Sequence, residues 1–238
     1  MIDLKERFRS LFEERPDEIG RYMDRDHLRF NLGGIEWVVS EIARKKGVSF
    51  SVYPATVKGV NALIESGNRC AGLIQQAGPH FAPIYVEKHL SGKYSIVFSD
   101  SIGTVDVRAF LSCCPEKMKL GRIFTTCVSR QSDYNSCAIF VIRDFAKYMG
   151  YMSQGKSVIM EMDAIRSHRI LFYESYDVWD IERLPEPMMR VAQSIEDIEA
   201  YGEPVKHYRV AEGGKIINGL IEKHKIKYMK QLLANFRV

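Results

Sequence analysis

Cys137 is the residue whose position says most about chemistry, because it directly precedes a segment with helical spacing of apolar side chains. Asn135 and Ser136 stand just before it as candidate helix caps. A thiol at a helix N-terminus faces the positive end of the helix dipole and unpaired backbone N–H groups, and both favour the thiolate. The position therefore predicts a nucleophile, with a buried structural cysteine as the alternative.

A base and an orienting acid are predicted at the two ends of a hairpin. His80 immediately precedes a predicted strand over 81–86, and Asp100 immediately follows a second over 94–99. Because adjacent strands of a hairpin return to the same end of a sheet, we expect the two side chains to be neighbours. Asp100 would then accept a hydrogen bond from one imidazole nitrogen, and the other nitrogen would face the thiol of Cys137.

Gln131 lies six residues before Cys137 and is predicted to serve the same site. Its side-chain amide can donate to a developing oxyanion beside the N–H groups at the helix start. The alternative is a solvated glutamine in a loop.

The cysteine count argues against other uses of sulfur. Five cysteines form an odd number without a CxxC pair, which disfavours a disulfide framework and a zinc site and fits a reducing compartment. Cys113 and Cys114 lie in a proline-containing segment and Cys127 lies in a predicted strand, so we expect none of these three to be the nucleophile.

The elements that must position these residues follow from periodicity and turn chemistry. Helices are predicted over 2–15, 35–46, 54–64, 137–150, 188–201 and 216–235, and strands over 70–75, 81–86, 94–99 and 122–128. Pro83 cannot donate to a ladder, which predicts an edge or bulged position for its strand. Helices, then a sheet, then helices predict an α+β fold with a small mixed central sheet flanked by helices.

Composition is that of one globular fold spanning 1–238. Apolar residues make up 46% of the chain and charged residues 27%, without repeats or linker-like stretches. The apolar run over 138–142 is far too short to span a bilayer, and the charged start over 1–6 argues against a cleaved secretory signal.

Charge is distributed unevenly near the C-terminus. Residues 205–238 contain eight basic and two acidic side chains, whereas 174–203 contain nine acidic and two basic ones. These segments are either solvated or paired faces, or the basic one helps to line a pocket for a polyanion. No recognisable nucleic-acid-binding signature accompanies the charge, so nucleic acid is not an expected partner.

The motifs around these residues resemble a known group of cysteine enzymes. His80-Phe81, Asp100 and the run from Gln131 to Phe140 resemble the adenain/SUMO-protease-like clan, whose order is His, Asp or Glu, Gln, Cys. Within that clan the chain most resembles the YopJ family of bacterial effector acetyltransferases. The family blocks are matched at 92–97, Leu184-Pro185, Gln193-Ser194, Tyr201 and 223–233, so the resemblance covers about 35–238.

This resemblance implies a cysteine-protease-like catalytic core over 35–150 and a helical regulatory region over 174–238. It also implies a two-step acyl transfer. Cys137, activated by His80, attacks the thioester of acetyl-CoA while Asp100 holds the imidazole tautomer. The acetyl group then passes to Ser, Thr or Lys of a host signalling protein such as a kinase.

The family is activated by inositol hexakisphosphate, and the resemblance extends to that ligand. It implies a site that includes Arg190, Lys223, Lys225 and Lys230, since several cations must converge on such a polyanion. The alternative for each is a solvated position on a helix. Delivery from the bacterium into the host cytoplasm is implied in the same way.

Two departures from the clan pattern keep other functions open. Ser136 stands where the clan usually has Asp, and Ala138 stands where it usually has Gly. A catalytically silent effector that binds a host kinase or an inositol phosphate is one alternative. A deubiquitinase or SUMO-type isopeptidase with the same triad is another, disfavoured by the 101 residues that follow Cys137.

Overall fold

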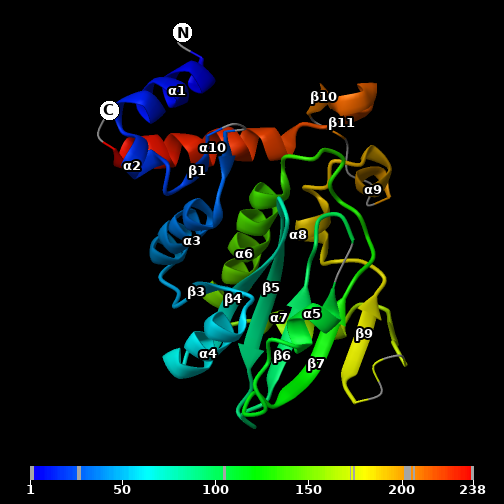
Figure 1. Ribbon diagram of the computed structural model, residues 1–238. Coiled ribbons are helices and arrows are strands. Elements are labelled where there is room, and N and C mark those ends of the chain that lie inside the picture. Colours follow the sequence, from blue (N-terminus) through cyan, green and yellow to red (C-terminus); the bar gives the residue numbers. More distant parts are fainter. Residues whose placement is uncertain are drawn as a thin grey trace.

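A central mixed sheet with helices on both faces organises the molecule (Figure 1). The computed structural model describes residues 3–25, 28–103, 106–171, 173, 175–200, 205 and 207–236. Among these residues, seven strands follow the spatial order β3-β4-β5-β6-β7-β9-β8. They are β3 (Ser51–Pro54), β4 (Cys70–Ala77), β5 (His80–Lys88), β6 (Tyr94–Phe98), β7 (Leu120–Thr125), β8 (Ser167–Arg169) and β9 (Asp177–Ile181). The predicted α+β class is confirmed, and β3, β8 and β9 extend the sheet beyond the four predicted strands.

The sheet is mixed because β4, β5 and β6 form an antiparallel meander, whereas β3–β4, β6–β7 and β7–β9 pair in parallel. The prediction that Pro83 marks an edge strand or a bulge is wrong, since β5 lies in the interior and Pro83 pairs in register with Ile74. Its carbonyl accepts from Ser99 N at 3.2 Å, just beyond the last paired rung with β6. The missing N–H therefore falls where that ladder ends.

Helices surround the sheet and differ widely in length. They are α1 (Leu4–Glu14), α2 (Pro16–Ile19), α3 (Leu32–Lys46), α4 (Val57–Ser66), α5 (Val107–Leu111), α6 (Cys137–Ser153), α7 (Val158–Asp163), α8 (Glu186–Met189), α9 (Ile195–Glu199) and α10 (Leu220–Asn235), with a 3₁₀ turn over Glu212–Gly214. Two small antiparallel pairs complete the described structure: β1 (Met23–Asp24) with β2 (Arg29–Phe30), and β10 (Tyr208–Val210) with β11 (Ile216–Asn218).

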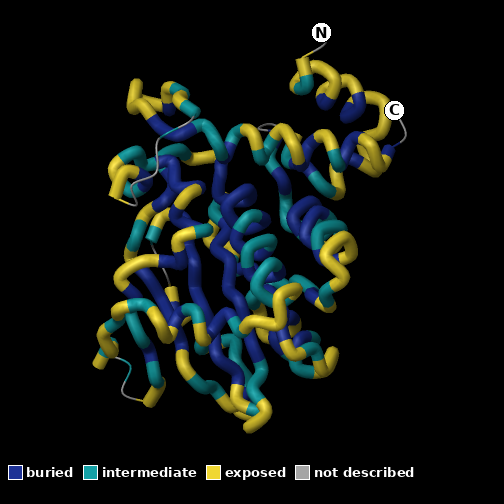
Figure 2. The backbone as a smooth tube through the Cα atoms, turned by 180° about the vertical axis from the view of Figure 1, so that it is seen from behind, coloured by how far each residue is buried: buried dark blue, intermediate teal, exposed yellow. Residues whose placement is uncertain are grey.

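Alternating side chains on the strands supply two cores. On β5, Ile84 belongs to the core shared with α4 and α5, whereas its neighbour Tyr85 belongs to the core shared with α3, α6 and α10. Figure 2 shows the strands and the inner sides of the helices as the buried part of the fold. No helix within the described ranges is long and apolar enough to span a membrane.

Close packing fixes α6 on the sheet. Gly72 of β4 has no side chain, and the ring of Phe145 from α6 occupies that space, with ring atoms 2.7–3.1 Å from where a Cβ would lie. Because α6 begins at Cys137, this contact helps to set the position of the predicted nucleophile.

Several predicted helix boundaries are wrong for local reasons. Pro54 ends β3, and α4 begins at Val57 because the Thr56 hydroxyl accepts from Gly59 N at 3.2 Å. Gly150 lies inside α6, which continues to Ser153.

The C-terminal helices also differ from the prediction. The helix expected over 188–201 is two short helices, since Gln193 N donates to Arg130 O at 2.7 Å and Ser194 caps α9. The helix expected from residue 216 starts at Leu220, because 216–218 pair with β10. The predicted end at Tyr201 and the predicted start at residue 2 lie outside the described residues.

Candidate active site

His80 and Asp100 meet at one end of the β5–β6 hairpin. His80 is the first residue of β5, and Asp100 follows β6 by two residues. The Nε2 atom of His80 lies 2.6 Å from Oδ1 of Asp100, which also accepts from Ile102 N at 3.3 Å. The carboxylate is 1% exposed, so a buried acceptor holds one nitrogen of the imidazole and leaves Nδ1 for another partner.

Cys137 supplies that partner from the first turn of α6. Its side chain is buried, with the residue 2% exposed, and Sγ contacts the carbonyl oxygen of Pro79 at 3.8 Å, next to His80 in the chain. Burial by itself lowers the pKa of His80, but hydrogen bonds and charge interactions with Asp100 and Cys137 outweigh it and raise the pKa to about 9. His80 therefore contacts the carboxylate of Asp100 and interacts with the thiol of Cys137.

The start of α6 lacks the side-chain cap expected there. Neither Asn135 nor Ser136 caps the helix: Ser136 occupies the cap position without a capping hydrogen bond, and its hydroxyl donates to Asp133 at 2.9 Å instead. The first N–H groups of a helix have no partner within the helix. The amides at Cys137 and Ala138 are thus positioned to donate to an anion beside Sγ.

Gln131 lies in the loop that leads to α6 and is 8% exposed. Its Oε1 accepts from the Ser101 hydroxyl at 2.6 Å, and its Nε2 donates to the carbonyl of Asp133 at 2.5 Å. Because an amide nitrogen carries two hydrogens, one remains beyond this bond for another acceptor. The contact with Ser101 also joins the loop of Gln131 to the segment that carries Asp100.

Asp133 is a site residue that the sequence analysis missed. Within the described structure its carboxylate accepts from Asn135 N, Ser136 N and the Ser136 hydroxyl, all in the loop before Cys137. A local signal was available, since an Asp a few residues before a helix commonly accepts from backbone N–H groups. This carboxylate stands three residues before the position at which the clan usually has Asp.

A buried ion pair between Arg130 and Asp144 anchors the same loop to α6. Arg130 donates to both oxygens of Asp144 at 2.9 and 2.6 Å and to the carbonyl of Ser99 at 2.7 Å, and both charged side chains are fully buried. The guanidinium also lies over the ring of Phe140 at 5.2 Å. Arg130 thereby links α6 to the residue that precedes Asp100.

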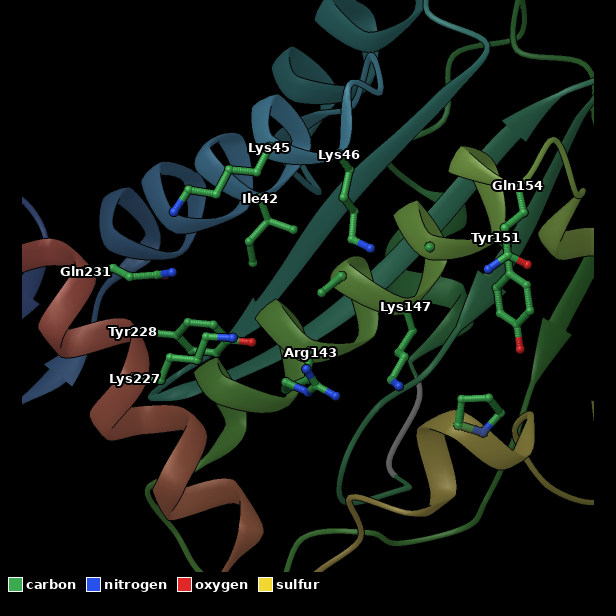
Figure 3. A pocket seen from close by; sticks show the side chains of 13 residues that line it. Ile42, Lys45, Lys46, Arg143, Lys147, Tyr151, Gln154, Lys227, Tyr228 and Gln231 are labelled. Atoms are coloured by element: carbon green, nitrogen blue, oxygen red, sulfur yellow. The ribbon is translucent and has the colours of Figure 1, made fainter.

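A basic cavity of about 530 Å³ lies between α3, α6 and α10 (Figure 3). Basic side chains from all three helices line it: Lys45, Lys46, Arg143, Lys147 and Lys227. No acidic residue lines the cavity in the part of the chain that the structure describes. The arrangement suits a ligand with several negative charges, since convergent cations leave the space strongly positive.

Burial and nearby cations together shift the pKa of two groups on α6 and α10, helices that line this cavity. Burial lowers the pKa of Lys147, and the charge of Arg143 lowers it further. Burial and the charges of Arg143 and Lys227 lower the pKa of His224 to about 3. An anionic ligand would oppose the part of each shift that the neighbouring positive charges cause.

The residues that the sequence predicted for the activator do not line this cavity: Arg190, Lys223, Lys225 and Lys230. Arg190 forms an ion pair with Glu186 at 2.5 Å, and its charge contributes to the lowered pKa of Lys147. Lys223 Nζ lies 3.1 Å from Nε2 of His207. The structure therefore gathers a different set of cations, of which Lys227 comes from the predicted segment.

Solved structures of other proteins share this fold. No protein-family model and no curated protein matches this chain. A solved structure described as AvrA delL154 with IP6 and CoA matches with a TM-score of 0.61 at 14% identity, over 97% of this chain and 97% of that one. HopZ1a in complex with IP6 matches with a TM-score of 0.61 at 12% identity, over 100% of this chain and 94% of that one. HopZ1a in complex with IP6 and CoA gives a TM-score of 0.56 over 83% of both chains.

The chain thus shares its fold with AvrA and HopZ1a. Within this fold His80 and Asp100 meet near Cys137, at the first turn of α6. The predicted α+β fold, with a mixed central sheet flanked by helices, is therefore confirmed.

Proposed function

We propose that this protein is an effector acetyltransferase of the YopJ type that transfers an acetyl group from acetyl-CoA through Cys137. The observation that carries the proposal is the position of His80, between the buried carboxylate of Asp100 and the thiol at the start of α6. Solved structures that share the fold hold CoA and IP6, which supports the choice of donor and activator.

The first half-reaction forms a thioester on the protein. The thiol proton of Cys137 passes to His80, and Sγ forms a bond to the acetyl carbon of acetyl-CoA. When the tetrahedral intermediate collapses, the bond to the CoA sulfur breaks and His80 returns the proton to it. Asp100 accepts from Nε2 throughout and stabilises the imidazolium.

The second half-reaction releases the acetyl group to an acceptor. His80 takes the proton of a Ser or Thr hydroxyl, or of a neutral Lys amine, as that group attacks the thioester. The bond to Sγ then breaks, and the proton returns to Cys137. In both steps the oxyanion accepts from the amides at the start of α6 and from Gln131 Nε2.

The basic cavity is the proposed site of inositol hexakisphosphate. Its cations come from α3, α6 and α10, so one ligand would join the proposed catalytic core (35–150) to the proposed regulatory region (174–238). Because Cys137 is 2% exposed, the acyl donor needs a rearrangement near α6 to reach Sγ, and the ligand contacts this same helix. A host signalling protein such as a kinase, reached after bacterial delivery, is the proposed acceptor.

Incubation with labelled acetyl-CoA tests the proposal. We expect labelled protein in the wild type, more label with inositol hexakisphosphate, and no label in Cys137→Ala. Cys127→Ala is the matched control, because Cys127 is exposed and should leave the label unchanged. Absence of label with and without the activator would favour a silent binding effector, and covalent capture by a ubiquitin electrophilic probe would favour the isopeptidase.

Thermal scans locate the activator site. Inositol hexakisphosphate should raise the melting temperature of the wild type, because it binds the folded state. The increase should be lost in Lys147→Glu/Lys227→Glu and kept in Lys223→Glu/Lys225→Glu if the cavity is the site. The reverse result would assign the ligand to the residues that the sequence predicted.

A further inference from the structure

Asp133 connects the loop before Cys137 to the C-terminal part of the chain. Besides its local partners, its Oδ2 accepts from Gln193 Nε2 at 2.8 Å and from a guanidinium nitrogen of Arg209 at 2.5 Å. The side chain is 7% exposed. All these partners donate, so the carboxylate satisfies donors from three separate segments at once.

The partners outside the loop form a clamp around it. The side-chain amide of Gln193 donates to Asp133 through its nitrogen and accepts from Ser132 N at 2.8 Å through its oxygen. The backbone N–H of Gln193 donates to Arg130 O at 2.7 Å. Gln193 is 1% exposed, so the clamp is shielded from water. Gln193 therefore helps to fix the conformation of this loop, although it lies 60 positions after Asp133 in the chain.

Arg209 extends the connection to α10. One of its terminal nitrogens donates to Asp133, and the other donates to Glu222 in the first turn of that helix at 3.2 Å. The same helix carries Lys227 in the basic cavity. A guanidinium suits this role because its fixed fork can hold two carboxylates in a defined relation.

We infer that Asp133 is a positioning residue for Cys137, and that Arg209 makes this positioning depend on the C-terminal region. Asp133 holds the N–H and hydroxyl of Ser136, the residue directly before the nucleophile. Loss of the carboxylate would free the start of α6 and move Sγ relative to His80. The effect of this positioning on catalysis rests on the proposed function, whereas the position of the Cys137 thiol can be tested without it.

The test measures the reactivity of Cys137 without acetyl-CoA. Iodoacetamide labels the full-length protein, and mass spectrometry follows the peptides of Cys137 and Cys127 separately. Asp133→Asn and Arg209→Gln should each slow labelling of Cys137 about tenfold and acetyl transfer about a hundredfold, since small misplacements of reacting groups cost rates of that order. Arg209→Lys should recover part of the loss by restoring the charge.

Controls separate positioning from general loosening. Labelling of Cys127 should stay at the wild-type rate in every variant, and Arg44→Gln, which removes an exposed ion pair with Glu41 on α3, should change neither rate. Asp133→Asn combined with Arg209→Gln should be no slower than Asp133→Asn alone, because both act through one contact.

Three results would overturn the inference. They are wild-type labelling of Cys137 in both single variants, a parallel change at Cys127, or multiplicative losses in the double variant. If Asp133→Asn fails to fold, Arg209→Gln decides the matter, because its side chain is partly exposed. If only the proposed function is wrong, the wild type will show no acetyl transfer, and the differences in Cys137 labelling between the variants will persist.

Discussion

Replacing Asp100 by Asn tests the interaction between Asp100 and His80 through its effect on the free energy of unfolding. The buried carboxylate and the thiol raise the pKa of His80 from 6.5 to about 9 against the effect of burial. A full shift of that size corresponds to about 3 kcal/mol of stabilisation of the protonated folded form. Because 19% of the side chain is exposed, screening reduces the expected contribution to about 2 kcal/mol.

The sign of the pH dependence follows from the raised pKa. A group that binds its proton more tightly when folded stabilises the protein fully below its unfolded pKa, here 6.5, and this contribution is lost as pH rises through about 9. Between about pH 6 and about pH 10, the wild type should lose about 2 kcal/mol more of its free energy of unfolding than His80→Gln does. The matching difference in melting temperature is about 4–8 °C. The excess over Asp100→Asn should be smaller, because that variant keeps the contribution of Cys137 to the pKa of His80.

Urea unfolding at a series of pH values measures this difference. His80→Gln is the second reference, because it removes the titrating group and cancels contributions from other groups in the same pH range. Parallel curves for wild type, Asp100→Asn and His80→Gln would refute the assignment of a raised pKa to His80.

Three further changes have defined consequences. Arg130→Met should lower the free energy of unfolding by about 3–5 kcal/mol in chemical denaturation, because it leaves Asp144 buried without its partner. Gly72→Ala should cost about 1–3 kcal/mol in the same measurement, since the new Cβ would meet the Phe145 ring at 2.7 Å. Lys147→Glu should weaken binding of inositol hexakisphosphate at least about tenfold in calorimetry.

Matched controls define the limits of these predictions. Arg44→Gln removes an exposed ion pair and should change stability by less than about 0.5 kcal/mol. Lys58→Glu reverses an exposed charge on α4, away from the cavity, and should leave ligand binding at the wild-type value. An Arg44→Gln variant as destabilised as Arg130→Met would contradict the role given to burial. A Lys58→Glu variant that binds the ligand as weakly as Lys147→Glu would contradict the location given to the site.

The contact between His80 and Asp100 was predictable because it depends on local topology. Both residues bracket one hairpin, and the register of two antiparallel strands fixes which ends meet. The start of α6 at Cys137 followed from apolar periodicity in the same way. Their catalytic roles remain predictions.

Contacts between distant segments were not predictable from one sequence. Lys45 and Lys46 belong to the basic last turn of α3, a pattern that the helix dipole explains by itself. Only the packing of α3 against α6 and α10 turns them toward Lys147 in one cavity. The link from Asp133 to Arg209 likewise joins residues 76 positions apart, and neither carries a periodic signal.

The measurement that tests the central claim most directly is capture of the acetyl group on Cys137. Wild-type protein would be mixed briefly with acetyl-CoA and inositol hexakisphosphate, quenched in acid, and digested for mass spectrometry. The account predicts an acetyl thioester on the Cys137 peptide that hydroxylamine removes, with none in His80→Gln. An acetyl group found only on other residues, or a thioester formed equally in His80→Gln, would contradict it.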